Sequence, residues 1–569
     1  MIERVVVTCC SIAIYTCLSA SAVEMDGQKP AETANSSELG AIDGIILDLH
    51  GAPLRKAIVT LAPSQDERTQ QNRSYSSVSD SEGHFSLESV EPGTYRLWAE
   101  RSGFLRQNYG GHGPEDWGTG VKLAPGQRLS GVVLQMTPAA TLTGRVVDED
   151  DDPVGDVDAV AFRYSYALGV RRAQVVALGQ TDSAGEFKVI GIAPGRYYVV
   201  AVPLHVGTVA QIFSPQNADK AEYSYTATYY PNVTDAAGAQ QITVLPGGSQ
   251  SIGDLKLRRT RVFHVRGQVR DDAHMRKGHI VIRAAPADSR WAVGLTNMPS
   301  AEIALQDGSF DILGVPPGSC TLMVTAAVGQ LRILGRQDVE VREGDVNKLT
   351  VDLTPGVEVA GTIAYADPEP NSGSTSKKER PGPIVSLSPT DPVLLSSPGK
   401  RIMDGSFKFP DVSPARYRVR VTDTPEDEYL QGIKSSGGED LIANDLDLSS
   451  GGVSQNLILT FKRAPASIDG TVQDADGNHL ADIAISLAPR PLDLHQTHRY
   501  RRVFSNKDGH FTFAGLAPGD YCVYVWDRLG DGEEFDSALL EQSAGSCQHV
   551  RIEENEKKSL DLTFRQRTD

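Results

Sequence analysis

Short runs in which apolar and polar residues alternate recur along this chain, and Gly, Pro, Asp and Asn separate them. Residues 45–47 and 57–61 form two such runs, with a His-Gly-Ala-Pro turn at 50–53 between them. Side chains of a β-strand point alternately to its two faces, so this pattern predicts strands with one buried face, joined by tight turns. Convincing helical periodicity is missing from the sequence, and we expect few helices.

The pattern repeats five times, at intervals of roughly one hundred residues. Each copy carries an Asp, a Gly and a Phe, and ten residues after the Phe comes the last residue of a Pro-Gly-Xaa-Tyr-like turn. The Phe and turn residues are Phe85 and Tyr95, Phe187 and Tyr197, Phe310 and Cys320, Phe407 and Tyr417, and Phe511 and Tyr521. A glycine lies 41 to 46 residues before each Phe, as Gly44, Gly144, Gly267, Gly361 and Gly470. The repeat predicts one structural unit used five times.

These units predict an all-β chain, a string of five antiparallel Greek-key β-sandwich domains of Ig-like type. The expected bounds are 41–138, 139–260, 261–355, 356–464 and 465–569, and we refer to these units as modules one to five. Each is long enough to bury a core of its own. Hardly any linker separates one closing strand from the next opening strand, so we expect a semi-rigid string.

The first residues predict export from the cytoplasm. Arg4, an apolar stretch over 5–18 and a small-residue triplet at 20–22 form the pattern of a cleavable signal peptide at 1–22, and 23–40 has the composition of a flexible leader. A second apolar run of about 18 residues does not follow, so we expect no membrane span after cleavage. The chain is predicted to be secreted, whether periplasmic, on the cell surface or extracellular.

Charge and cysteine content narrow the possible partners. The sequence has 55 Lys and Arg against 73 Asp and Glu, a net charge of −18, which argues against nucleic acid as a partner. After signal cleavage three cysteines remain, Cys320, Cys522 and Cys547. Cys522 and Cys547 share module five and are candidates for a disulfide, although spacing alone leaves open whether the two sulfurs meet. Cys320 replaces the recurring tyrosine, and we expect a buried thiol.

The repeated motif, Gly-Xaa-Val-Xaa-Asp through Asp-Xaa-Xaa-Gly-Xaa-Phe to Pro-Gly-Xaa-Tyr, resembles the carboxypeptidase regulatory-like domain. The resemblance implies a prealbumin-like sandwich close to the carbohydrate-binding-like fold, and tandem copies look like secreted bacterial proteins of that type. It implies a fold and not a reaction. Collagen-adhesin-type repeats are a related alternative, in which a Glu four residues after the tyrosine assists a Lys–Asn isopeptide bond. Here those positions hold Ala99, Ala201 and Val525, which argues against such cross-links.

The strand that begins at the recurring tyrosine offers the best candidates for ligand contact. Period-two alternation places Tyr95 and Tyr521 in the core and puts Trp98, Tyr524 and Trp526 on the outer face. Outward aromatic rings can stack against sugar rings. The candidate ligand-binding residues are therefore Trp98, Trp117, Tyr524 and Trp526. The alternative is that these side chains pack under a loop or between modules. In module four the corresponding outer positions hold Arg418 and Arg420.

Other clusters of potential ligands have simpler explanations. A His-Xaa-Xaa-Glu at 112–115 matches a zinc-ligand spacing, but it lies in a Gly-rich loop without a third ligand. The acidic turns at 148–152 and 474–478 hold the residues that such turns need for their backbone. Known nucleophile, phosphate-loop and dinucleotide motifs are lacking. We expect no catalytic residue, no metal and no cofactor.

The sequence therefore favours a secreted, non-enzymatic, multi-domain binding protein. Carbohydrate, as polysaccharide or cell-envelope glycan, is the expected ligand, bound through exposed aromatic side chains with avidity from several modules. The alternative is a structural spacer or protein–protein interaction scaffold of the cell envelope, with envelope proteins as partners. An enzyme would require convergent titratable side chains in a deep pocket of one module.

Overall fold

Strands account for nearly all regular structure in this chain. The computed structural model describes residues 39–63, 73–111, 113, 118–167, 170–203, 223–271, 280–286, 298–304, 306–328, 330–367, 382–391, 397–526, 529–530 and 532–564. Within these ranges the α-helical content is one six-residue helix, α2 (Ser537–Gln542). The predicted signal peptide at 1–22 and most of the leader at 23–40 lie outside the described residues. The predicted all-β fold class is confirmed.

Modules one and two each consist of two β-sheets with a hydrophobic core between them. Module one contains β1 (Gly40–Leu47), β2 (Ile58–Pro63), β3 (Tyr75–Val78), β4 (His84–Val90), β5 (Gly93–Glu100), β6 (Gln107–Asn108), β7 (Val121–Leu123) and β8 (Arg128–Gln135). Module two contains β9 (Ala140–Val147), β10 (Val157–Ala167), β11 (Val170–Gln180), β12 (Glu186–Ile192), β13 (Gly195–Pro203), β14 (Tyr223–Thr226), β15 (Thr228–Tyr229), η3 (Ala236–Gly238), β16 (Ile242–Val244) and β17 (Ser249–Lys256). A further strand, β18 (Arg258–Arg261), pairs with β14 and leads into module three.

The remaining three modules follow the same plan. Module three contains β19 (Phe263–Arg270), β20 (Ile280–Pro286), β21 (Ser300–Glu302), β22 (Ser309–Val315), β23 (Gly318–Val328), β24 (Gln330–Val341) and β25 (Val346–Asp352). Module four contains β26 (Val357–Tyr365), β27 (Ile384–Pro389), β28 (Lys400–Arg401), β29 (Ser406–Val412), β30 (Arg416–Thr422), β31 (Tyr429–Ser435), β32 (Leu446–Asp447) and β33 (Gln455–Lys462). Module five contains β34 (Ala466–Gln473), β35 (Ala484–Pro489), η5 (Thr497–Arg499), β36 (Arg501–Phe504), β37 (His510–Leu516), β38 (Gly519–Trp526), η6 (Glu533–Phe535), α2, η7 (Ala544–Ser546), β39 (Gln548–Ile552) and β40 (Lys557–Thr563).

One strand pair in each module departs from the predicted antiparallel pairing. The opening and closing strands run parallel, for example β1 with β8 and β34 with β40. After the opening strand, the chain passes through the second sheet before it returns to the first. The closing strand then runs in the same direction as the opening strand. The opening strand therefore lies in the middle of its sheet, as in the orders β4-β1-β8 and β37-β34-β40.

The recurring glycine and phenylalanine are cross-strand neighbours. Gly44 on β1 lies opposite Phe85 on β4. The later modules repeat this pairing as Gly144–Phe187, Gly267–Phe310, Gly361–Phe407 and Gly470–Phe511. The spacing of 41 to 46 residues in the sequence is therefore the register of two paired strands.

The acidic residue and the tyrosine of the repeat each close a turn. In module one the carboxylate of Asp80 accepts hydrogen bonds at Oδ1 from the backbone N–H groups of Glu82 and His84, both at 2.9 Å. The Tyr95 hydroxyl donates to the carbonyl oxygen of Glu91 at 2.8 Å. The same bond, to the residue four positions earlier, is made by Tyr197, Tyr417 and Tyr521. The repeated motif therefore specifies the fold of each module.

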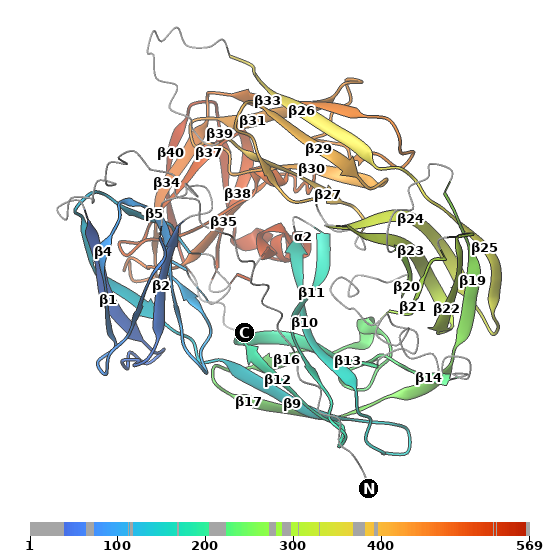
Figure 1. Cartoon of the computed structure of the whole chain (residues 1–569). Helices are drawn as coiled ribbons and strands as arrows, with labels where there is room; N and C mark the ends of the chain where they lie inside the picture. Colours follow the sequence, from blue (N-terminus) through green and yellow to red (C-terminus); the bar gives the residue numbers. More distant parts are fainter. Residues whose placement is uncertain are drawn as a thin grey trace, which may run out of the picture.

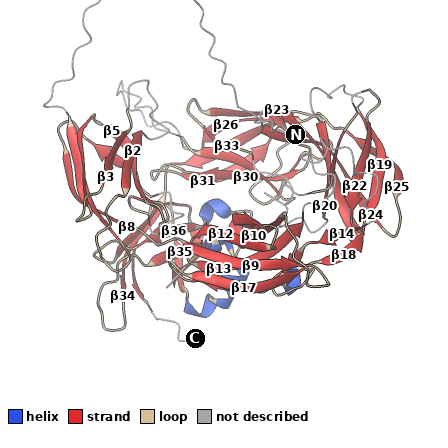
Figure 2. Ribbon diagram, turned by 60° about the horizontal axis from the view of Figure 1, so that its bottom comes forward, coloured by secondary structure: helices blue, strands red, loops and turns tan. Residues whose placement is uncertain are grey.

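The five sandwiches follow one another along the chain as predicted, and in space they lie around a ring (Figures 1 and 2). Module five, orange to red in Figure 1, lies beside module one, in blue. The hairpin of β10 and β11 extends from module two toward the middle of the ring, where it meets module five near α2 (Figure 1). No pattern in the sequence indicates these contacts between modules that are far apart in the chain.

Hydrogen bonds fix several of the contacts between modules. Arg172 on β11 donates from Nη2 to the carbonyl oxygen of Pro389 in module four, at 2.9 Å. The Tyr429 hydroxyl of module four donates to Oε1 of Glu554 in module five at 2.9 Å, and Nζ of Lys462 lies 2.6 Å from the same oxygen. Module four therefore contacts both module two and module five.

Candidate functional site

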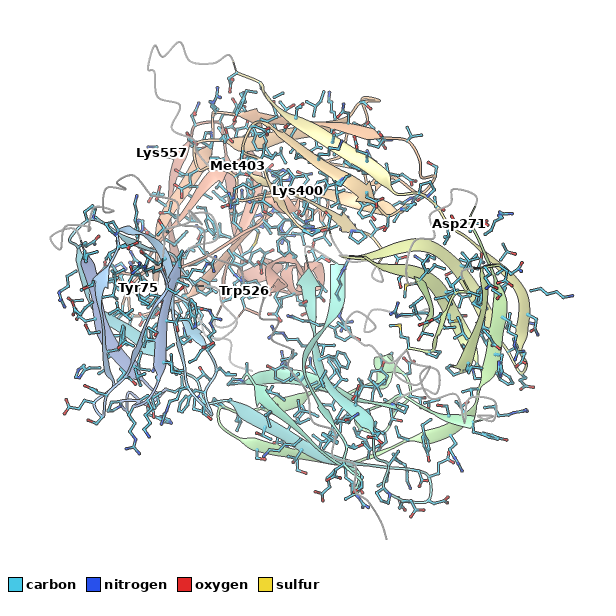
Figure 3. All side chains as sticks on the ribbon, viewed as in Figure 1. Tyr75, Asp271, Lys400, Met403, Trp526 and Lys557 are labelled. Carbon is cyan, nitrogen blue, oxygen red and sulfur yellow. A yellow bond between two sulfur atoms is a disulfide. The ribbon has the colours of Figure 1, made fainter. Side chains whose placement is uncertain are left out.

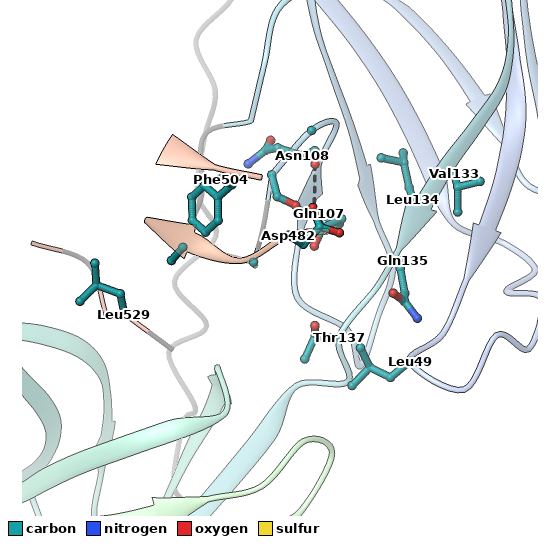
Figure 4. A pocket seen from close by; sticks show the side chains of 14 residues that line it. Leu49, Gln107, Asn108, Val133, Leu134, Gln135, Thr137, Asp482, Phe504 and Leu529 are labelled. Carbon is teal, nitrogen blue, oxygen red and sulfur yellow. Dashed lines mark hydrogen bonds between the residues drawn. The ribbon is translucent and has the colours of Figure 1, made fainter. Parts of the chain in front are cut away.

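A cleft of about 630 Å³ lies between module one and module five, where the two ends of the ring meet (Figure 4). Module one contributes the turn after β1, the β6 region and the end of β8, and module five contributes residues around β35 and β36. The lining residues are Leu49, Gln107, Asn108, Gly110, Gly111, Gly113, Val133, Leu134, Gln135, Thr137, Asp482, Ala484, Phe504 and Leu529. Clefts between domains are a common place for ligand binding.

Gln107 stabilises the loop after β6, which forms part of the cleft wall. Its side chain is almost fully buried, and Nε2 donates to the carbonyl oxygens of Asn108 and Gly111 at 3.1 and 2.8 Å. On the other side β6 pairs with β5, where Asn108 lies opposite Trp98. Hydrogen bonds within the loop and the pairing of β6 with β5 therefore fix the loop on the second sheet of module one.

The lining combines polar groups, one of them a carboxylate, with apolar ones. Asn108, Gln135 and Asp482 bring amide and carboxylate groups, and Gln135 donates from Nε2 to the carbonyl oxygen of Asp48 at 3.2 Å. Val133 keeps 55% of its surface exposed, although it is a valine on a strand. Sequence reasoning missed these residues, because no local pattern marks a contact between segments more than 300 residues apart.

Trp98 lies on the outer face of β5, as the alternation predicted, but it is half-buried. The guanidinium of Arg106 lies over its indole ring, with Cζ 4.1 Å from the ring centroid. The indole Nε1 is buried and has no hydrogen-bond acceptor among the described residues. The ring is therefore partly covered by its own module and is not an open platform.

Tyr524 and Trp526 are also on the predicted face of β38, but the expectation that they are exposed is wrong. Tyr524 is 1% exposed and Trp526 is 8% exposed. Their rings stack with centroids 5.5 Å apart, the Tyr524 hydroxyl donates to the carbonyl of Leu540 at 3.2 Å, and the indole of Trp526 donates to Oγ of Ser486 at 2.8 Å. The region around α2 covers this face and builds a second small core on it (Figure 3). Because both rings are buried, neither can stack against a ligand.

The remaining sequence candidates either lie outside the described residues or belong to a turn. Trp117 and the His112 and Glu115 of the His-Xaa-Xaa-Glu pattern lie outside the described residues. In the acidic turn at 474–478 the Asp474 carboxylate accepts from the backbone N–H groups of Asp476 and Asn478, at 2.9 and 2.8 Å. The turn therefore uses its aspartate to hold its own backbone, as the sequence suggested.

A disulfide joins Cys522 on β38 to Cys547, just before β39, with Cα atoms 5.6 Å apart. The imidazole of His549 lies 3.7 Å from the Cys522 sulfur, and the three residues form a group with the spacing of a metal site. Since both sulfurs are used in the bridge, they offer no thiolate to a metal. Cys320 is free and buried, as expected, and burial raises the pKa of its thiol to about 11.

The comparison with protein families confirms the resemblance expected from the motif. Residues 41–137 match the model of the carboxypeptidase regulatory-like domain. Among curated proteins, Colossin-A of Dictyostelium discoideum is 25% identical over 197 residues, which is 32% of this chain and 2% of Colossin-A. The chain therefore spans a very small part of the length of that relative.

The comparison with solved structures finds matches at low identity and low TM-score. The TIE protein of Bacillus anthracis is 10% identical, with 75% of this chain and 74% of that chain covered and a TM-score of 0.16. The minor pilin GBS52 of Streptococcus agalactiae is 10% identical, with 39% and 96% covered and a TM-score of 0.21. Two B repeat units of the collagen binding protein of Staphylococcus aureus are 10% identical, with 74% and 99% covered and a TM-score of 0.14. In the described part of the chain, no helix has the length and apolar character needed to cross a membrane.

Proposed function

We propose that this chain is a secreted, non-enzymatic binding protein that takes a carbohydrate in the cleft between modules one and five. The observation that carries the proposal is the lining of that cleft, which combines the amides of Asn108 and Gln135 and the carboxylate of Asp482 with the ring of Phe504. The predicted signal peptide and the disulfide of module five support secretion, since disulfides persist in oxidising compartments.

The chemistry of the lining suits sugars better than charged or purely apolar ligands. Planar amide and carboxylate groups hydrogen-bond to neighbouring hydroxyls, and an aromatic ring contacts the apolar face of a pyranose. The volume of about 630 Å³ falls in the range of small-molecule sites. The site differs from the one expected from the sequence, because it uses Phe504 in place of the buried Tyr524 and Trp526.

A glycan array and pull-down on insoluble polysaccharides test the proposal with the full chain. We expect retention of the wild type, and loss of most retention in Phe504→Ala and Asn108→Ala. Val78→Ala is the matched control, because Val78 is an exposed apolar side chain of module one on β3, outside the cleft lining. Absence of any retained glycan, or retention that is unchanged in both cleft variants, would contradict the proposal. A loss only in Trp98→Ala would move the site to the outer face of β5.

A second candidate function is a spacer or protein-interaction scaffold of the cell envelope. The contacts of module four with modules two and five favour it, because they hold the modules in a fixed arrangement, as a spacer or scaffold requires. This function predicts a protein partner recovered by cross-linking on intact cells, and no affinity for glycans. Cross-linking that recovers the chain alone, together with glycan binding, would exclude it.

A further inference from the structure

Cys522, Cys547 and His549 meet on the outer face of the second sheet of module five. Cys522 on β38 lies directly opposite His549 on β39 in the strand register. Side chains of directly opposite residues share a face of the sheet, with Cβ atoms about 4.5–5.5 Å apart. Cys547 has an extended backbone and precedes His549 by two residues, so period two turns it to the same face. The pairing of the two strands therefore brings the three side chains together.

The distances between the three groups match those of metal ligands. Each ring nitrogen of His549 lies 3.7 Å from the sulfur of Cys522, and one ligand atom from each of the three residues lies within 4.8 Å of the others. A tetrahedral Zn²⁺ with a sulfur at about 2.3 Å and a nitrogen at about 2.0–2.1 Å holds these two ligands about 3.6 Å apart. The separation of the Cys522 sulfur from the imidazole is therefore that of two ligands of one metal ion.

The disulfide prevents a metal from binding in the oxidised chain, because thiolates and not disulfides are metal ligands. In a tetrahedral zinc site two thiolates lie about 3.8 Å apart. The Cα atoms of Cys522 and Cys547 are 5.6 Å apart, and each sulfur is two bonds from its Cα, so rotation about the Cα–Cβ bonds can provide that separation. After reduction the backbone can therefore keep its place.

The three residues differ in burial in a way that suits entry of an ion from solvent. Cys522 is fully buried, Cys547 is half-buried against the small core around α2, and His549 is exposed. Among the described residues, His549 has no hydrogen-bonding or ion-pair partner other than the sulfur of Cys522. No described carboxylate therefore competes with a metal for the imidazole, and the exposed side of the group gives access to water as a fourth ligand.

We propose that Cys522, Cys547 and His549 form a Zn²⁺ site when the disulfide is reduced. A dithiol reductant is oxidised to its own disulfide and transfers two electrons and two protons to the bridge, which leaves a thiol on each cysteine. Zn²⁺ then replaces the two thiol protons, which pass to solvent, and neutral His549 donates a nitrogen lone pair as the third ligand. None of the three residues lines the cleft between modules one and five, and the site does not depend on the function proposed for that cleft.

In this site the metal and the disulfide are alternative cross-links of one segment. The chain between the two cysteines carries α2 and covers Tyr524 and Trp526. Either cross-link fixes Cys547 against β38 and so holds the segment on the sheet. A metal that binds only the folded chain also stabilises it. Zn²⁺ therefore keeps the small core around α2 closed under reducing conditions.

Zinc titration of the reduced full chain tests the proposal. The chain is reduced, freed of the dithiol by gel filtration under argon, and titrated with Zn²⁺ against a chromophoric chelator. We expect the reduced wild type to bind more Zn²⁺ than Cys522→Ser/Cys547→Ser does, and the oxidised wild type to bind no more than that variant. Every sample keeps the cysteines outside the site, Cys320 among them, so the difference between samples reports the site alone.

His549→Ala distinguishes a three-ligand site from binding to two thiolates alone. Loss of an outer-shell partner typically weakens metal affinity about 10- to 100-fold, so loss of a direct ligand should lower the affinity for Zn²⁺ by at least about tenfold. His510→Ala is the matched control, since His510 is an exposed histidine on β37 in the other sheet of module five. Both variants keep the disulfide, and protease resistance equal to that of the oxidised wild type shows that they fold.

Limited proteolysis gives a readout other than affinity. Zn²⁺ should restore resistance to cleavage between residues 522 and 547 in the reduced wild type, but not in Cys522→Ser/Cys547→Ser. No additional Zn²⁺ in the reduced wild type, or equal affinity in the wild type and His549→Ala, would overturn the proposal. Cleavage that continues after Zn²⁺ has bound would refute the metal as a replacement for the bridge.

Discussion

Gly144 and Phe187 face each other across the ladder of β9 and β12, and a Cβ atom on Gly144 would lie 2.6 Å from Cζ of the phenylalanine ring. Real Cβ atoms do not approach other atoms so closely, so the ring occupies the space that a side chain on the opposite strand would need. The Phe ring is also close at Gly361 and Gly470, whereas a Cβ atom on Gly44 or Gly267 would first meet Val132 or Leu349 of the closing strand. In all five modules the strands leave no room for a side chain at this glycine.

Gly144→Ala should destabilise module two by about 1–3 kcal/mol, the usual cost of adding a methyl group to a packed site. The measurement is amide hydrogen exchange in peptides from β9 and β12 of the full chain, because a five-module protein does not unfold in one step. Gly238→Ala is the control in the same module, since its Cβ would meet Val233 at an ordinary 3.5 Å. Equal protection in Gly144→Ala and the wild type would contradict the steric explanation.

Tyr197→Phe should lower the free energy of unfolding of module two by about 0.5–1.5 kcal/mol, the worth of one hydrogen bond. The hydroxyl donates to the carbonyl of Ala193 at 2.8 Å, and this bond closes the Pro-Gly turn. Tyr198→Phe keeps the ring that stacks on Phe162 and serves as the matched control. Amide hydrogen exchange around β13 is measured in both variants. If Tyr198→Phe loses as much protection as Tyr197→Phe, the hydrogen bond from Tyr197 to Ala193 does not have the proposed role.

Replacing both Cys522 and Cys547 by serine should loosen the segment between them, which carries α2 and covers Tyr524 and Trp526. The expected loss is about 2–4 kcal/mol, typical of a structural disulfide. Limited proteolysis should then cut between the two positions, and the emission of Trp526 should shift to longer wavelength as its cover is lost. Reductant should reproduce both effects in the wild type and add nothing in the double variant. Unchanged proteolysis after reduction would argue against a structural role for the bridge.

His498 should make module five sensitive to acid. Its pKa is about 6.5 when unfolded and about 3 when folded, because burial and then Arg501 disfavour the charged form. As the pH falls, His498 is therefore protonated in the unfolded chain before it is protonated in the folded one. The folded state keeps its full stability, as far as His498 affects it, above about pH 6.5 and loses part of it as the pH falls from about 6.5 toward 3. A difference of one bound proton changes the free energy of unfolding by about 1.4 kcal/mol per pH unit. Because His498 is only half-buried, we expect a smaller change.

The pH dependence is measured as the difference in Tm between the wild type and His498→Gln from pH 7 to pH 4. We expect the variant to lose less stability over this range. His84→Gln, at an exposed histidine of module one, should follow the wild type. Parallel curves for the wild type and His498→Gln would rule out the effect.

Much of each module was predictable because its determinants are local. Tyr521 and Val523 enter the main core of module five while Cys522 and Tyr524 leave it, as period two requires. The glycine and phenylalanine spacings also predicted a common unit, although only the structure showed that Gly470 and Phe511 are direct neighbours.

The candidate site was not predictable in the same way. Alternation tells which face of a strand a side chain takes, but not what lies against that face. Trp526 was expected to be exposed and is covered by the α2 region, and Phe504, with no marked pattern around it, lines the cleft with Asn108.

The sequence by itself determined five all-β modules, the turns that close them and the faces of their strands, because these depend on residues that are near one another in the chain or repeat at a fixed spacing. Only the tertiary structure decided the cleft between Asn108 and Phe504 and the contacts of module four with modules two and five. The physical reason is that packing between modules depends on the shape and charge of whole surfaces, which arise only after each module has folded.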